Sequence, residues 1–254
     1  MLDNSKGIKA FFQKAVACWA LDGTTGGLVD QSGNNNNLTL KGGVIESPII
    51  STNAGNSGYL YKNNILDFVE GPTTAILSGI TSFTVIAWIS TLGTTGTTQN
   101  ILTKLRIAGS EKFSLSIDTN LAPVIRIVQV GGAGVSTIST TRIIVNTRNL
   151  VIGTFNAATF TRSIYLNGNL ENRAVGALGI IAGGSLLKIG QRDANLPFNG
   201  TIGQCGVLNY AITAQQVSDY YNYETEPVRK YWDFADVHAT RRHQKVTNKS
   251  LVTI

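Results

Sequence analysis

Residues 198–217 read FNGTIGQCGVLNYAITAQQV, and this stretch decides the fold of the chain. The pair Asn199-Gly200 predicts a small turn. The side chains from residue 202 to residue 212 then alternate between two faces, in the pattern of a half-buried strand. Cys205 and Val207 fall on one face of that strand, with glutamine, glycine and leucine on the other. The stretch therefore predicts a strand that borders a hydrophobic core.

Thr213 follows this strand and is a residue type that caps helices well. We expect it to begin a short polar helix over residues 214 to about 223, which turns away from the sheet. Residues 83–90, FTVIAWIS, form the least ambiguous strand, because both of its faces are largely apolar. A strand that is covered on both sides is typical of the middle of a two-sheet sandwich.

Short strand candidates fill most of the chain, and Gly, Asn or Pro turns separate most of them. Asn167-Gly168 is a strong two-residue hairpin turn. Charged residues are only 14% of the 254 residues. This composition and spacing favour an all-β sandwich over a helical protein. The candidates are residues 100–105, 113–118, 124–130, 135–141, 150–156, 162–166 and 186–190.

The net charge of +6 belongs to the two ends of the chain. Residues 1–17 carry three lysines against one aspartate, and residues 227–254 carry six basic residues against two aspartates. The remaining residues have equal numbers of basic and acidic side chains. An electrostatic partner would therefore meet the ends first, and the neutral middle does not favour nucleic acid as that partner.

Five segments together resemble laminin G-like domains of the concanavalin A-like lectin/glucanase superfamily. They are the opening CWALDG with DQSGNNNNL, the strand SFTVIAWIS, the hairpin around YLNG, the strand LKIG and the closing stretch. One departure is Arg148, which stands where the family's hairpin usually begins with Trp. The resemblance covers about residues 16–222 and implies a two-sheet antiparallel jelly roll whose last strand lies beside the first.

We accordingly expect three parts: an N-terminal arm (1–15), a laminin G-like jelly-roll domain (16–226) and an extended basic and aromatic tail (227–254). The resemblance would place Cys18 and Cys205 on neighbouring strands, where a disulfide is conceivable but not favoured. The first residues lack the pattern of a signal peptide, and no apolar run has the length of a membrane span. We expect a protein that is made in the cytoplasm and is not inserted into a membrane.

Catalytic and metal chemistry find little support. A glycosidase needs two carboxylates across a groove, and the acidic pairs Asp67/Glu70 and Glu224/Glu226 are more typical of solvated charge. His238 and His243 are expected at the surface of the tail. We expect no cofactor, with calcium as the alternative, because the resemblance implies a rim site at Asp22 and Asp30. These two aspartates are more simply explained as residues that cap turns.

Aromatic residues on the strands could stack on sugars, but we expect Trp19, Trp88, Phe155 and Tyr165 to pack in the core. The ends offer better candidates for binding. There, aromatic and basic side chains would anchor the protein to a protein partner. These residues are Phe11, Phe12, Tyr231, Trp232, Phe234, Arg241 and Arg242.

The sequence thus predicts a non-enzymatic structural or adhesion protein, held in a larger or oligomeric assembly by its terminal arms. The favoured role is a decoration or fibre component of a phage particle, virion-associated, with a lectin-like domain that faces outward and contacts glycans. The alternatives are a free carbohydrate-binding module and a degenerate glycoside hydrolase.

Overall fold

The computed structural model of the chain describes residues 15–21, 25–42, 45–47, 58–62, 67–71, 81–105, 111–129, 132–176, 186–192 and 196–225. Nearly all of the predicted N-terminal arm and basic tail lie outside these ranges. The same is true of the candidate anchor residues Phe11, Phe12, Tyr231, Trp232, Phe234, Arg241 and Arg242, and of Asp22, His238 and His243.

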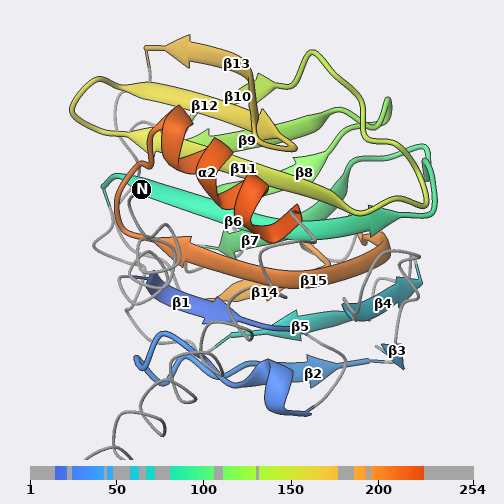
Figure 1. The fold of residues 1–254 in the computed structure, drawn as a ribbon. Helices are drawn as coiled ribbons and strands as arrows, with labels where there is room; N and C mark the ends of the chain where they lie inside the picture. Colours follow the sequence, from blue (N-terminus) through green and yellow to red (C-terminus); the bar gives the residue numbers. More distant parts are fainter. Residues whose placement is uncertain are drawn as a thin grey trace, which may run out of the picture.

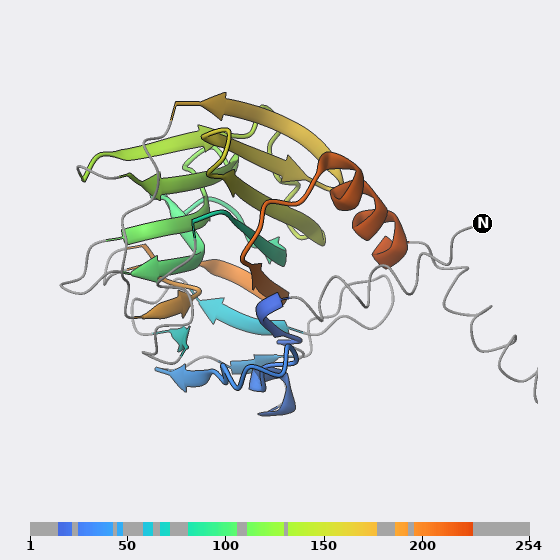
Figure 2. The same ribbon diagram turned by 90° about the vertical axis from the view of Figure 1, so that its left-hand side faces the viewer.

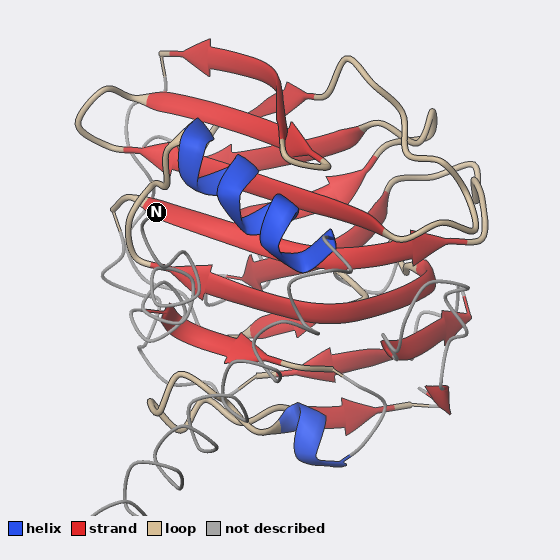
Figure 3. Cartoon of the chain, viewed as in Figure 1, coloured by secondary structure: helices blue, strands red, loops and turns tan. Residues whose placement is uncertain are grey.

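Two antiparallel sheets pack face to face, as the sequence predicts (Figures 1 and 3). The first sheet has the order β13 (Asn169–Val175), β12 (Thr161–Leu166), β11 (Asn149–Asn156), β6 (Phe83–Thr91), β15 (Asn199–Leu208), β4 (Gly58–Lys62), β3 (Ile45–Ser47), and β1 (Ala15–Trp19) also pairs with β15. The second has the order β10 (Gly134–Ile138), β9 (Pro123–Val128), β8 (Glu111–Ile117), β7 (Gln99–Leu105), β14 (Leu187–Ile189), β5 (Phe68–Glu70), β2 (Thr39–Lys41). A 3-10 turn, η1 (Thr25–Leu28), and the helix α2 (Ala214–Thr225) complete the described elements.

The main core lies between the sheets and follows the alternation of β6. Phe83 and Val85 point into it, and the Phe83 ring stacks on Phe113 of the second sheet with centroids 4.3 Å apart. The Phe155 ring packs against the Phe83 ring, with centroids 6.1 Å apart. These rings are fully buried, so the aromatic residues join the two sheets by apolar contact.

The helix α2 lies on the outer face of the first sheet (Figure 2). A second hydrophobic cluster forms between this helix and the sheet. Ile86 and Trp88 of β6 contribute to it, and the helix adds Val217 and Tyr220. The expectation that the helix turns away from the sheet was therefore wrong. Val217 and Tyr220 are three positions apart, which puts them on one helical face, and burying that face holds the helix against the sheet.

The closing strand pairs with the first strand, which confirms the expected return of the chain. Trp19 lies opposite Cys205, and Cys18 lies opposite Gly206. The two cysteines therefore point to opposite faces of the sheet: Cys205 into the main core and Cys18 toward the outer cluster. Both are free thiols, because this register separates the side chains that a disulfide would join.

The Asn-Gly pairs behave differently from each other. Asn167 and Gly168 both have positive φ, 49° and 86°, and form the predicted tight turn between β12 and β13. Asn199 and Gly200 do not form a turn but begin β15. A Cβ on Gly200, at φ 148°, would come within 2.2 Å of the Ser90 carbonyl oxygen. Glycine is used here for close approach of two strands.

Several predicted strands end earlier than expected, and two of them differ most. The strand expected over 202–212 ends at Leu208, and the strand expected over 135–141 ends at Ile138. In the second case residues 139–141 leave the sheet because the Glu171 carboxylate accepts hydrogen bonds from them. Side-chain acceptors thus compete with the strand ladder for these polar groups.

Candidate functional site

A cavity of about 330 Å³ lies on the outer face of the first sheet, beside the first turn of α2. Strands β11, β12 and β13 supply its floor, and residues 211–214 supply one wall. Most of the lining side chains carry hydroxyl or amide groups: Thr154, Asn156, Thr159, Thr161, Ser163 and Tyr165. The cavity thus presents polar groups beside apolar surface, whereas the surface under the rest of the helix is mainly apolar.

The floor is built by cross-strand register. Thr154 of β11 lies opposite Thr84 of β6 and, on its other side, opposite Ser163 of β12. Ser163 in turn lies opposite Arg173 of β13. Paired residues share a face of the sheet, so these four side chains form one polar row across four strands.

The wall is tied to the same row. The Thr84 hydroxyl donates a hydrogen bond to the Tyr210 carbonyl at 2.7 Å and accepts one from the Ile212 amide at 3.1 Å. Thr213 then caps α2 as predicted, since its hydroxyl accepts a hydrogen bond from the Gln216 amide and the Gln216 side chain accepts one from the Thr213 amide. This reciprocal capping box fixes where the helix begins over the cavity.

Three hydroxyl groups on the floor have no hydrogen-bond partner within the described ranges of the chain. They belong to Thr154, Ser163 and Tyr165, whose exposed fractions are only 3%, 3% and 2%. The residues are buried, but their hydroxyl oxygens are not among the buried polar atoms that lack a partner in the described ranges, so these oxygens are open to the cavity. Because these three face a cavity, they are available to a polar ligand.

The cavity has a positive end. Arg173 lies on it and is exposed, and it makes no ion pair within the part of the chain that the structure describes. Ala214, the first residue of the 12-residue α2, also lines the cavity. A helix N-terminus carries partial positive charge, and none of the residues that line the cavity is acidic.

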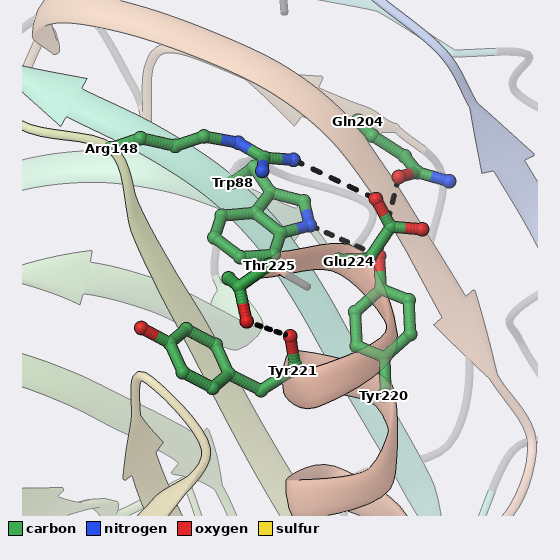
Figure 4. Close-up of polar contacts among 7 residues, drawn as sticks. All are labelled: Trp88, Arg148, Gln204, Tyr220, Tyr221, Glu224 and Thr225. Atoms are coloured by element: carbon green, nitrogen blue, oxygen red, sulfur yellow. Dashed lines mark hydrogen bonds and ion pairs between the residues drawn. The ribbon is translucent and has the colours of Figure 1, made fainter. Parts of the chain in front are cut away.

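The other end of α2 is anchored by a buried polar cluster (Figure 4). The Trp88 indole N–H donates to the Tyr220 hydroxyl at 3.1 Å, and that hydroxyl donates to Gln204 at 3.2 Å. Arg148 covers the Trp88 ring and pairs with Glu224 at 3.8 Å. Burial raises the pKa of Tyr220 well above its ordinary value, and the Glu224 charge adds to that rise. The Tyr220 hydroxyl therefore stays protonated.

The aromatic residues that could have stacked on sugars are buried, as expected: Trp19, Trp88, Phe155 and Tyr165. The Trp19 indole N–H donates to the Asn36 carbonyl at 2.8 Å. Tyr165 differs from the others because, although buried, it borders the cavity. Sequence reasoning missed the cavity itself, for which the alternating threonines and serines of β11 and β12 are the available signal.

Asp30 organises the loop after η1, in agreement with the turn-capping interpretation. Its carboxylate accepts hydrogen bonds from the amides of Cys18, Ser32 and Asn36 at 2.9–3.0 Å and from the Ser32 hydroxyl at 2.8 Å. A calcium ion would have to compete with these bonds. No group of three or more His, Cys, Asp or Glu side chains suited to a metal occurs among the described residues.

Asp67, Glu70 and Glu224 are at least partly buried, which differs from the solvated charge that the sequence suggests. Asp67 is 2% exposed, and Glu70 lies 3.6 Å from the Lys41 ammonium group. Glu224 is held by Arg148, while Glu226 lies outside the described residues. These carboxylates are occupied by interactions within the fold, and none of them lines the cavity.

Residues 66–218 match the sequence model of the Concanavalin A-like lectin/glucanases superfamily, which is more than half of the chain. The protein belongs to this superfamily. No curated protein matches the chain. Within the described ranges, neither helical element combines the length and apolar character that crossing a membrane requires.

Many solved structures share the fold. The botulinum neurotoxin serotype G binding domain has a TM-score of 0.64 and 16% identity, over 83% of this chain and 51% of that one. A structure of botulinum neurotoxin type C is described as dependent on two ganglioside molecules for cell entry. It has a TM-score of 0.65 and 16% identity, over 86% of this chain and 53% of that one. The binding domain of Paraclostridial Mosquitocidal Protein 1 has a TM-score of 0.64 and 15% identity, over 84% of this chain and 53% of that one. The chain spans about half the length of these structures, and the likeness shows the fold.

Proposed function

We propose that this protein is a non-enzymatic, lectin-like adhesion protein that binds carbohydrate in the cavity beside α2. One observation carries the proposal. Three residues, Thr154, Ser163 and Tyr165, are almost completely buried except where they line one cavity, and their hydroxyl groups have no partner within the described residues. Sugar hydroxyls both donate and accept hydrogen bonds, so they suit a surface of this kind.

Membership of the superfamily also supports carbohydrate binding, because the description of the superfamily names lectins together with glucanases. One of the similar structures is described by the dependence of its cell entry on gangliosides, which are glycolipids. That ligand belongs to a protein of about twice the matched length. It supports carbohydrate as a class for this chain and does not indicate a particular glycan.

Binding rather than hydrolysis is supported by the lining of the cavity. Hydrolysis of a glycosidic bond commonly uses two carboxyl groups separated by about 5–10 Å. The cavity lining has no carboxylate, and Glu70 and Glu224 are engaged by Lys41 and Arg148. A degenerate hydrolase is the alternative, and release of reducing sugar from a panel of polysaccharides would reveal it.

The proposal is tested by screening the full chain, fluorescently labelled, on a glycan array over a range of protein concentrations. We expect saturable binding to a related set of glycans. Binding that is absent at every concentration, or that does not distinguish glycans from blank spots, would overturn the proposal. A heat-unfolded sample provides the control for non-specific adhesion.

We further propose that the terminal segments fasten the protein to a larger assembly, such as a phage particle on which the sandwich faces outward. The supporting observation is the charge distribution, since the ends are basic and the rest of the chain is neutral. The aromatic side chains Tyr231, Trp232 and Phe234 stand beside that charge in the tail. Production in the cytoplasm and association with a virion remain part of this proposal.

Light scattering on the full chain tests the assembly proposal. We expect a defined oligomer, which dissociates when Tyr231, Trp232 and Phe234 are replaced together by serine. A chain that is monomeric both before and after this replacement would remove the main support for self-assembly through the tail. Glycan binding through the sandwich would be unaffected by that result.

A further inference from the structure

We infer that the cavity takes an acidic sugar, a uronic or sialic acid residue whose carboxylate lies between Arg173 and the first turn of α2. This inference rests on the proposed function, because it names the class of carbohydrate for the same cavity. It goes further in assigning a charge to the ligand and a separate role to each side of the site.

Arg173 provides the first argument. It lies on the cavity, it is exposed, and no described carboxylate pairs with it. Arg148 on the same face of the sheet shows the contrasting case, because Glu224 neutralises it. A guanidinium group presents a planar fork of donors that matches a carboxylate in two-point contact. Arg173 therefore remains available for an anionic ligand.

The first turn of α2 provides the second argument. Ala214 lines the cavity, and the amide groups of a first helical turn lack partners within the helix. The capping box accounts for the Gln216 amide. The positive end of this helix therefore adds to the Arg173 charge at the cavity, and no acidic lining residue cancels either of them.

The floor supplies the selectivity for a sugar over a simple anion. The hydroxyls of Thr154 and Ser163, which face the cavity, can each donate and accept, which matches the hydroxyls of a pyranose ring. The cavity volume of about 330 Å³ is near the lower end of the range for small-molecule pockets, about 300–1,000 Å³. This size suits one sugar residue rather than an extended oligosaccharide.

The test measures binding of three probes to the full chain by NMR titration: methyl glucuronide, methyl glucoside and the methyl glycoside of N-acetylneuraminic acid. We expect at least one acidic probe to bind roughly tenfold or more tightly than the neutral glucoside. Which acid binds distinguishes a uronic from a sialic residue. Arg173→Gln should remove the preference for acid, and Arg142→Gln, at an exposed arginine outside the cavity, should retain it.

Three outcomes would overturn the inference. The acidic and neutral probes could bind equally, the preference could survive Arg173→Gln, or no probe could bind while the array shows other glycans. In the first and third cases the acidic class fails, and in the second the acidic class stands but its placement at Arg173 fails; the proposed carbohydrate binding stands in all three. If the array shows no glycan binding at all, the proposed function and the inference fail together. Arg173 is exposed on an edge strand, so its replacement is not expected to impair folding.

Discussion

Arg148 lies flat against Trp88, with the guanidinium carbon 3.5 Å from the centre of the indole ring. The same guanidinium group pairs with Glu224 in the last turn of α2, so one side chain joins β6 to the helix. A cation is also favourable near a helix C-terminus. This contact explains how a charged residue at position 148 can cover the sheet.

Replacing Arg148 by alanine should therefore expose Trp88 and loosen the end of α2. A desolvated cation–π contact contributes about 2 kcal/mol, so we expect a loss of that order in the free energy of unfolding. Urea denaturation measures the loss, and a red shift of Trp emission reports the exposure. Arg142→Ala is the control, since Arg142 is exposed. Equal stability of the two variants would contradict this account of α2.

Tyr220→Phe should destabilise the fold without changing its shape. The change removes the acceptor of the buried Trp88 N–H and the donor to Gln204. Leaving such a group unpaired costs about 1–3 kcal/mol. Tyr221→Phe provides a matched control, because no partner of the Tyr221 hydroxyl occurs within the described ranges. If both variants unfold at the same urea concentration, the hydrogen-bond chain contributes nothing to stability.

The two thiols should be inert in the folded protein. Burial raises the pKa of Cys18 to about 11, with a further rise from the Asp30 charge that a backbone hydrogen bond from Gln31 opposes. Burial also raises the pKa of Cys205 well above its ordinary value. Because the thiolate is the reactive form, a thiol-specific reagent at neutral pH should label neither cysteine until the protein is unfolded. Rapid labelling of the native chain would show that this packing is wrong.

Acid should weaken the contact between β13 and residues 139–141. Burial alone would raise the pKa of Glu171, but hydrogen bonds from Thr141, Thr140 and Ser139 lower it below the ordinary value of 4.5. A lowered folded-state pKa stabilises the fold above the ordinary pKa, and this stabilisation is lost as the pH falls through the folded-state value. The difference in stability between the natural chain and Glu171→Gln should therefore be present at pH 7 and shrink below about pH 4. A difference that is independent of pH would contradict the assigned role.

Alternation and turn chemistry are local signals, so the sequence was sufficient for the strands, while the jelly-roll arrangement came from the resemblance to laminin G-like domains. The alternating run that begins at Phe83 indicates a strand buried on both faces. The pair Asn167-Gly168 indicates the hairpin between β12 and β13 without reference to any other segment. The position of α2 was not predictable in the same way. Its buried face consists of Val217 and Tyr220 in an otherwise polar helix, and tertiary contact with Trp88 decides where it packs.

The cavity was missed for a related reason. Thr154, Ser163 and Arg173 come from three strands and form one row only through the observed register. Threonine and serine on the exposed face of a strand are ordinary, so nothing in each residue alone indicates a site. The assignment of the terminal aromatic and basic residues to a partner stays a prediction, because those residues lie outside the described ranges.

The most direct test of the account is to fill the cavity from its wall and repeat the glycan array. Ala214 is exposed and lines the cavity, whereas its neighbour Gln215 is exposed and does not. We predict that Ala214→Trp abolishes the glycan binding of the full chain and that Gln215→Trp leaves it unchanged, with both variants folded by circular dichroism. Undiminished binding by Ala214→Trp would contradict the claim that carbohydrate binds beside α2.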